Sequence, residues 1–312
     1  LADKAREMGA NTMYSASQAA DALGYMALAG WDTTQMLAGI EPVLNLAAAS
    51  DMELAEASDI VTDYITAFGL SAQDASKFAD QMAFAMSKSN TSTEQLGEAY
   101  KNCAATAGSL GYTVEDTTAA LMTMANAGVK GGEAGTGLST IMTRLATNTK
   151  GCAKELAEYG VNVYDETGKM NSLSSILTGT AGVWETLTDK QQANLAKVIA
   201  GTSQYSKFQT IMSGLNDKAK ESGMSFQDYT EALESCDGAA AQMAATMQDN
   251  LKGKLTIMQS ALEACEESAY SLFDDELKDG VDSATESLTM LNRSITDGDM
   301  NVALSNIGDA LD

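Results

Sequence analysis

Ser71-Ala72-Gln73-Asp74, Ser92-Thr93-Glu94-Gln95 and Thr113-Val114-Glu115-Asp116 are the stretches that decide how this chain folds. In each, a hydroxyl side chain stands at a candidate helix N-cap. An acid or amide follows three residues later and can accept a hydrogen bond from the backbone N–H of the cap. Two stretches of the same type precede them, Asp32-Thr33-Thr34-Gln35 and Ser50-Asp51-Met52-Glu53.

The spacing of these five candidate caps predicts a stack of short helices. Successive caps are 18, 21, 21 and 21 residues apart, which leaves room for one helix of about four turns and a short connection. The composition agrees, since 45% of the residues are hydrophobic, only 6% are aromatic and a single proline occurs. Small and unbranched side chains favour helices over strands. We therefore expect an all-α fold, with most of the 18 methionines filling the core.

The first helix is expected over residues 1–30. Gly39 interrupts the next one, and Pro42 fits the first turn of a new short helix. The glycines expected to end helices are Gly69, Gly111 and Gly128. The glycine-rich segment 128–137 is then read as a hinge, which closes a helical stack over residues 1–150.

Residues 151–237 are expected to form a mixed helical unit that carries one small β-hairpin. The hairpin is predicted over residues 161–170, where β-branched and aromatic residues flank an Asp-to-Gly turn. Such a hairpin is marginal alone, so it should pack on neighbouring helices.

Residues 238–312 show a different pattern. Apolar residues recur there at spacings of three and four and form a narrow seam over residues 243–295. This pattern is typical of long coiled-coil-like helices. Two interpretations remain open, an intramolecular hairpin that turns near residues 274–279 and an interface between copies of the chain.

The net charge of −24 argues against several classes of partner. A nucleic-acid-binding protein needs a basic patch, and the sequence has no cluster of Lys and Arg. An anionic membrane surface would repel the chain as well. No stretch of about 18 apolar residues occurs that could span a bilayer. Because the sequence begins with Leu1 rather than Met, we expect a fragment or a processed piece.

We expect no catalytic, cofactor-binding or metal-binding residue. The absence of histidine excludes His-dependent triads and HExxH zinc sites. Carboxylate chemistry of the glycosidase type remains conceivable, but most of the 43 acidic residues should be helix caps or solvated surface. The glycines at 128–137 lack the residue order of a phosphate loop, and residues 297–299 lack that of an EF-hand. The four isolated cysteines are expected to be reduced: Cys103, Cys152, Cys236 and Cys265.

Several pieces of this sequence, taken in their collinear order, resemble phage tail tape measure proteins of the subfamily named for lactococcal-type siphophage tails. The similarity covers roughly residues 8–275. The pieces that carry it are residues 67–72, 89–99, 110–121, 127–131, 134–138, 160–170, 238–243 and 249–251.

The resemblance implies a structural, non-enzymatic protein of the tail lumen, assembled in the host cytoplasm. Such proteins set tail length and leave ahead of DNA at infection, and they also occur in prophages and phage-like particles. The implied partners are tail tube proteins, tail tip proteins, tail assembly chaperones and other copies of the chain. Two alternatives are a tail-delivered, carboxylate-dependent peptidoglycan hydrolase and a stand-alone helical protein-binding module.

Overall fold

The computed structural model describes residues 1–216 and 224–249, with the single residues Met258, Leu262, Thr285 and Thr289. The regular secondary structure in these ranges is helical, which confirms the predicted all-α class. The first seven α-helices are α1 (Ala2–Asn11), α2 (Ala16–Leu28), α3 (Thr33–Ser50), α4 (Leu54–Ala67), α5 (Ala75–Lys88), α6 (Thr93–Leu110) and α7 (Val114–Asn126). They are followed by α8 (Gly131–Ala146), α9 (Cys152–Glu158), α10 (Leu173–Trp184), α11 (Asp189–Ala200), α12 (Tyr205–Asn216), α13 (Phe226–Glu234) and α14 (Ala239–Gln248). Two 3-10 turns lie between them, η1 (Ala72–Asp74) and η2 (Thr149–Gly151).

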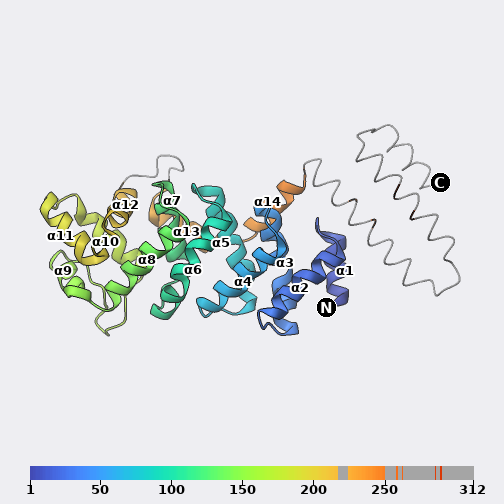
Figure 1. The fold of residues 1–312 in the computed structure, drawn as a ribbon. Helices are drawn as coiled ribbons and strands as arrows, with labels where there is room; N and C mark the ends of the chain where they lie inside the picture. Colours follow the sequence, from blue (N-terminus) through green and yellow to red (C-terminus); the bar gives the residue numbers. More distant parts are fainter. Residues whose placement is uncertain (217–223, 250–257, 259–261, 263–284, 286–288, 290–312) are drawn as a thin grey trace. The chain divides into compact units, whose positions relative to one another are not determined.

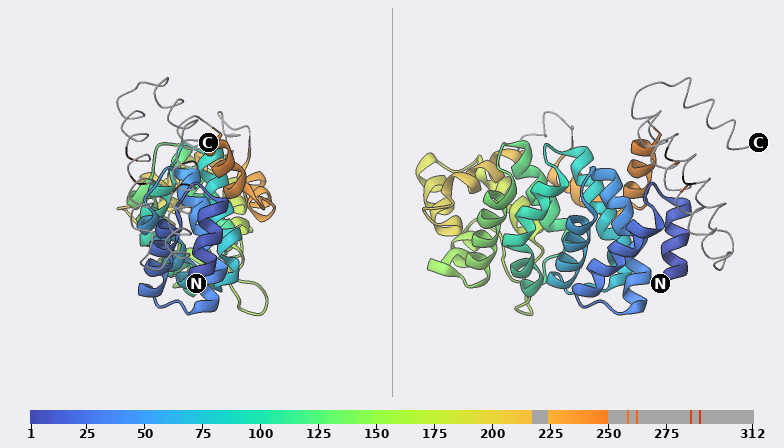
Figure 2. Two further views of the ribbon diagram at one scale, coloured as in Figure 1. Left: turned by 90° about the vertical axis from the view of Figure 1, so that its right-hand side faces the viewer. Right: turned by 45° about the vertical axis from the view of Figure 1, so that its right-hand side comes forward.

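The helices of residues 1–260, which form one compact unit, stand side by side in a row (Figure 1). Sequence neighbours pack against each other from α1 to α9, α10 and α11 both pack on α12, and the last two described helices then return along the row. The helix α13 packs on α7, and α14 packs on α3 and α5. Figure 2 shows the same row from two further sides. The return joins parts of the chain that are far apart in sequence.

Three connections between helices have the same type of turn, and this repetition explains the regular spacing of the caps. Gly30, Gly69 and Gly111 have φ values of +88°, +70° and +77°, in the left-handed region that glycine adopts without strain. In each connection the next residue donates its backbone N–H to the carbonyl five positions earlier, as from Tyr112 to Ala107 at 3.0 Å. This bonding closes the helix end, and the N-cap of the next helix follows at once.

The structure confirms three of the predicted N-caps. Asp32 and Ser92 accept hydrogen bonds from the backbone N–H groups three residues on, at 2.9 and 3.2 Å, in complete capping boxes. Thr113 caps α7 in the same way at 3.1 Å. Ser71 caps the 3-10 turn η1, which leads directly into α5.

The predicted cap at Ser50 is wrong. Ser50 is the last residue of α3, and α4 begins at Leu54 with Glu53 as its N-cap residue. Because Ala47, Ala48 and Ala49 are all buried, packing extends α3 past the expected boundary. Asp51 then takes the left-handed conformation that glycine provides elsewhere, with φ +52°.

The break expected at Gly39 and Pro42 is also absent, since α3 runs continuously through both positions. Gly39 is needed for packing instead. A Cβ atom there would lie 2.3 Å from the ring of Trp31. Pro42 is buried inside the helix, so tertiary packing outweighs its local preference for a first turn.

The glycine-rich segment 128–137 differs from the predicted hinge, because α8 begins at Gly131 and contains most of it. The turn itself is confined to the residues around Gly128, which has φ +89°. A Cβ atom at Gly135 would lie 2.0 Å from the carbonyl oxygen of Ala99. Gly135 therefore allows α6 and α8 to approach closely. Packing between these two helices favours a helix over a hinge in this segment.

The hairpin predicted over residues 161–170 is reduced to a single antiparallel bridge between Tyr164 and Met170. Its turn is held by the carboxylate of Asp165, which accepts hydrogen bonds from the backbone N–H groups of Thr167 and Lys169 at 2.8 and 2.9 Å. The hydroxyl of Tyr164 donates to the carbonyl of Ala146 at 2.6 Å and so attaches the turn to the end of α8.

The long helices predicted after residue 238 fall almost entirely outside the described residues. The helix α14 covers residues 239–248 of that region. Most of the apolar seam at 243–295 therefore lies beyond the part of the chain that the structure describes.

Candidate functional site

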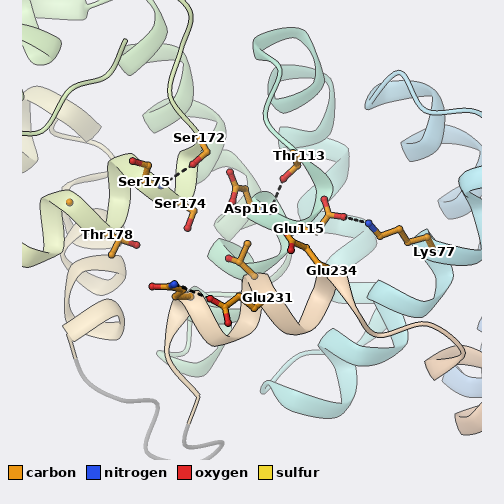
Figure 3. Close-up of a pocket in the computed structure, with 13 residues that line it drawn as sticks. Lys77, Thr113, Glu115, Asp116, Ser172, Ser174, Ser175, Thr178, Glu231 and Glu234 are labelled. Carbon is orange, nitrogen blue, oxygen red and sulfur yellow. Dashed lines mark hydrogen bonds and ion pairs between the residues drawn. The ribbon is translucent and has the colours of Figure 1, made fainter. Parts of the chain in front are cut away.

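A polar groove with a volume of about 850 Å³ opens between α7, α10 and α13 (Figure 3). Its lining combines hydroxyl side chains with four carboxylates, Glu115, Asp116, Glu231 and Glu234, and one cation, Lys77. Paired carboxylates are the chemistry that a histidine-free enzyme could still use, so the partners of these groups decide what the groove can do.

Glu115 is engaged by two neighbouring side chains of α5. Lys77 lies 2.6 Å from its Oε1, and the amide of Gln81 donates to the same atom at 2.8 Å. Burial alone would raise the pKa of Glu115, but these hydrogen bonds hold the pKa below its usual value. Glu115 is therefore an ionised structural anchor between α5 and α7.

Asp116 points to the start of α10. Burial raises the pKa of its carboxyl above the usual value, while the backbone N–H groups of Ser174 and Leu173 at the start of α10 oppose this rise by favouring the charged form. The unsatisfied N–H groups and the positive end of the helix dipole favour an anion at this place. The side chain predicted to complete a local capping box thus caps a different helix.

A hydroxyl group of the groove caps the same end of α10. Ser172 is the N-cap residue of that helix, and its Oγ accepts from the backbone N–H of Ser175 at 3.1 Å. On the opposite wall, Gln227 donates to Glu231 at 2.9 Å. The contacts of these groups therefore have a structural explanation, and we assign no reaction to the groove.

Three residues that the sequence analysis did not single out hold the ends of distant helices. Asp80 contacts the start of α14, and Gln81 donates to the carbonyl of Leu233 at the end of α13. Arg144 donates to the carbonyls of Val198 and Ile199 at the end of α11, at 2.7 and 3.1 Å. No local sequence signal marks them, because each partner lies more than 50 positions away.

The described residues contain no group of three or more Cys, Asp or Glu side chains placed to hold a metal ion. None of their helices is both long and apolar enough to cross a membrane. Cys103, Cys152 and Cys236 are free thiols, and burial raises the pKa of each. Cys265 lies outside the described residues.

Comparison with known proteins gives a consistent result. The family of phage-related minor tail proteins matches residues 2–201. A tape measure protein of Pneumococcus phage Dp-1 is 34% identical over 265 residues, which are 84% of this chain and 22% of the relative. A probable tape measure protein of Escherichia phage P2 is 30% identical over 278 residues, 88% of this chain and 33% of the relative. No solved structure matches. The chain thus spans between a fifth and a third of the length of these curated relatives.

Proposed function

Because the chain belongs to the family of phage-related minor tail proteins, we propose that it is a segment of a tape measure protein that determines the length of a phage tail. The observation that carries this proposal is the similarity to two tape measure proteins across more than four fifths of the chain. The role is structural, and the contacts described for the groove of Figure 3 agree with it.

The physical basis of a molecular ruler is the fixed rise of an α-helix, about 1.5 Å per residue. A single extended helix converts residues into length efficiently, whereas a stack of helices that returns on itself does not. We therefore propose that residues 1–237 anchor the protein during assembly. Residues 238–312 would contribute length, together with other parts of a longer protein.

The expected location is the lumen of the virion tail, reached from the host cytoplasm where tails assemble. The expected partners are tail tube proteins, tail tip proteins and tail assembly chaperones. The apolar seam at 243–295 would provide contacts between copies. These finer assignments rest on the resemblance to tape measure proteins, and copurification with each partner tests them one by one.

The decisive experiment compares two in-frame deletions of equal length in the phage that encodes this chain. Deletion of residues 251–271 leaves α14 intact and should shorten tails by about 30 Å in electron micrographs, the rise of 21 helical residues. Deletion of residues 71–91 removes one cap-to-cap period, including α5, and should abolish tails instead. Tails of normal length after the first deletion would contradict a ruler role for that segment.

A further inference from the structure

The return segment, residues 224–249, is attached to the row by polar contacts at the ends of its two helices, α13 and α14 (Figure 2). The carboxylate of Asp80 accepts hydrogen bonds from two backbone N–H groups at the start of α14, at 2.8 and 2.9 Å. The amide of Gln81 donates to the carbonyl of Leu233 near the end of α13, at 3.2 Å. Two successive residues of α5 therefore hold the facing ends of both helices.

A third attachment lies in the middle of α13, at the hydroxyl of Tyr229. Asn126, the last residue of α7, donates its side-chain amide to this hydroxyl at 2.9 Å. The hydroxyl in turn donates to the carbonyl of Lys88, the last residue of α5, at 3.3 Å. These hydrogen bonds are directional, and each is lost once the return segment moves away from the row.

The return segment buries few apolar side chains. The buried residues of α14 are two alanines, Ala240 and Ala244. The helix α7, on which α13 packs, buries eleven of its 13 residues. Because hydrophobic stabilisation is roughly proportional to the apolar area removed from water, the return segment is held less strongly than the helix that it covers.

Like charges face each other across the groove of Figure 3, which separates α13 from α10. Glu231 and Glu234 of α13 line one wall, and Glu115 and Asp116 of α7 line another. Burial raises the pKa of Asp116, and the charges of Glu115 and Glu234 raise it further. Lys77, the cation of this lining, lies 2.6 Å from Glu115 and offsets part of the repulsion.

We propose that the return segment detaches from the row as one unit, in a local opening that leaves α1 to α12 folded. The chain over residues 217–223 is its covalent link to the row, so α12 need not unwind. The helices α13 and α14 are joined by the short connection 235–238. This connection couples them, so that the contacts of Asp80, Gln81 and Tyr229 break together.

Opening changes the length of chain between the row and the residues that follow the return segment. Residues 217–249 are 33 in number, and they would span about 110 Å when fully extended. The return segment is therefore a joint of variable length. This inference depends on the contacts of the return segment and not on the proposed role in tail length, so either can fail without the other.

Hydrogen exchange of the full chain, followed by peptide mass spectrometry at low salt, tests the proposal. Peptides from α13 and α14 should show the same free energy of opening. Their protection should be at least about tenfold lower than that of α7. The helix α7 is the appropriate reference, because α13 packs on it and its own backbone hydrogen bonds persist when α13 leaves.

Two variants and a matched control identify the contacts that hold the return segment. Asp80→Ala removes the acceptor at α14, and it should also speed exchange at Tyr229 and Leu233 of α13 by about fivefold or more. Lys77→Gln should speed exchange of both helices by about twofold or more at low salt, and by less at high salt. Lys101→Gln, at an exposed position of α6, removes the same charge outside the groove lining and should change neither helix.

Three outcomes would overturn the proposal. Equal protection of the return segment and α7 in the parent protein would mean that the segment opens only when the row unfolds, and this comparison needs no substitution. Acceleration by Asp80→Ala that is confined to α14 would mean that the two helices open separately. Equal effects of Lys77→Gln and Lys101→Gln would mean that the charges at the groove do not control the opening.

Discussion

The carboxylate of Asp80 in α5 accepts a hydrogen bond from the backbone N–H of Gly238 at 2.8 Å, across 158 positions of sequence. The N–H of Ala240 donates to its other oxygen at 2.9 Å. Asp80 is only 5% exposed, so a buried anion satisfies the first turn of α14 and complements the helix dipole. This contact attaches the returning part of the chain to the middle of the row.

Removal of this cap should destabilise the protein. We expect Asp80→Ala to lower the free energy of unfolding by about 2 kcal/mol, because two buried N–H groups lose a charged acceptor. Urea unfolding measures the loss, and hydrogen exchange should accelerate first at Gly238 and Ala240. Asp59→Ala, on the exposed face of α4, serves as the control and should stay within about 0.5 kcal/mol of the parent. Equal effects of the two substitutions would contradict the assigned role of Asp80.

Two glycine substitutions should have opposite effects. Gly135→Ala places a Cβ atom 2.0 Å from the carbonyl oxygen of Ala99, so α6 and α8 must separate at a cost of at least about 2 kcal/mol. Gly24→Ala, within α2, meets no atom within 4 Å and should stabilise the protein by up to about 1 kcal/mol. Thermal unfolding of both variants distinguishes packing from helix propensity. A stable Gly135→Ala variant would show that the two helices are less close than described.

The confirmed cap at Ser92 should contribute measurably to stability. Ser92→Ala removes the acceptor for the backbone N–H of Gln95 and should cost about 1 kcal/mol. We expect a similar cost for Ser71→Ala, which removes the hydroxyl that contacts Asp74. Ser87→Ala, at an exposed position of α5, is the matched control with little expected change. Unchanged thermal midpoints for Ser71→Ala and Ser92→Ala would show that the caps do not stabilise the helices.

The buried thiols should resist alkylation in the native protein. Burial raises the pKa of Cys103 to about 12 and that of Cys236 to about 11, so the reactive thiolate is scarce at about pH 8. Cys103 and Cys152 are also almost inaccessible, at 1% and 0% exposure. Iodoacetamide should therefore leave both unmodified until urea is added, as peptide mass spectrometry can show. Rapid modification of Cys103 without urea would contradict the packing of α6.

The turn at Asp165 should weaken in acid. The hydrogen bond from the Thr167 hydroxyl, with those from the backbone, lowers the pKa of Asp165 below its ordinary 3.8. Because the folded pKa is depressed, the stabilisation is complete above the unfolded pKa and is lost as the pH falls through the folded one. Amide exchange of Thr167 and Lys169 should rise in that window. Asp165→Asn should remove this dependence, and a variant that still shows it would contradict the assignment.

The capping stretches determined the fold class from sequence alone, because an N-cap and its partner lie three residues apart and need no tertiary context. The predicted caps at Asp32, Ser92 and Thr113 accordingly match the structure. The same local chemistry failed at Ser50 and Pro42, where burial of the neighbouring residues keeps α3 continuous.

Tertiary structure alone decided the contacts that hold the row together. Asp80, Asp116 and Arg144 each bind the end of a helix that lies more than 50 positions away, and nothing in their local sequence distinguishes them from surface charges. A local pattern fixes hydrogen bonds within one turn of helix, whereas the partner of a buried polar group depends on which helices pack together.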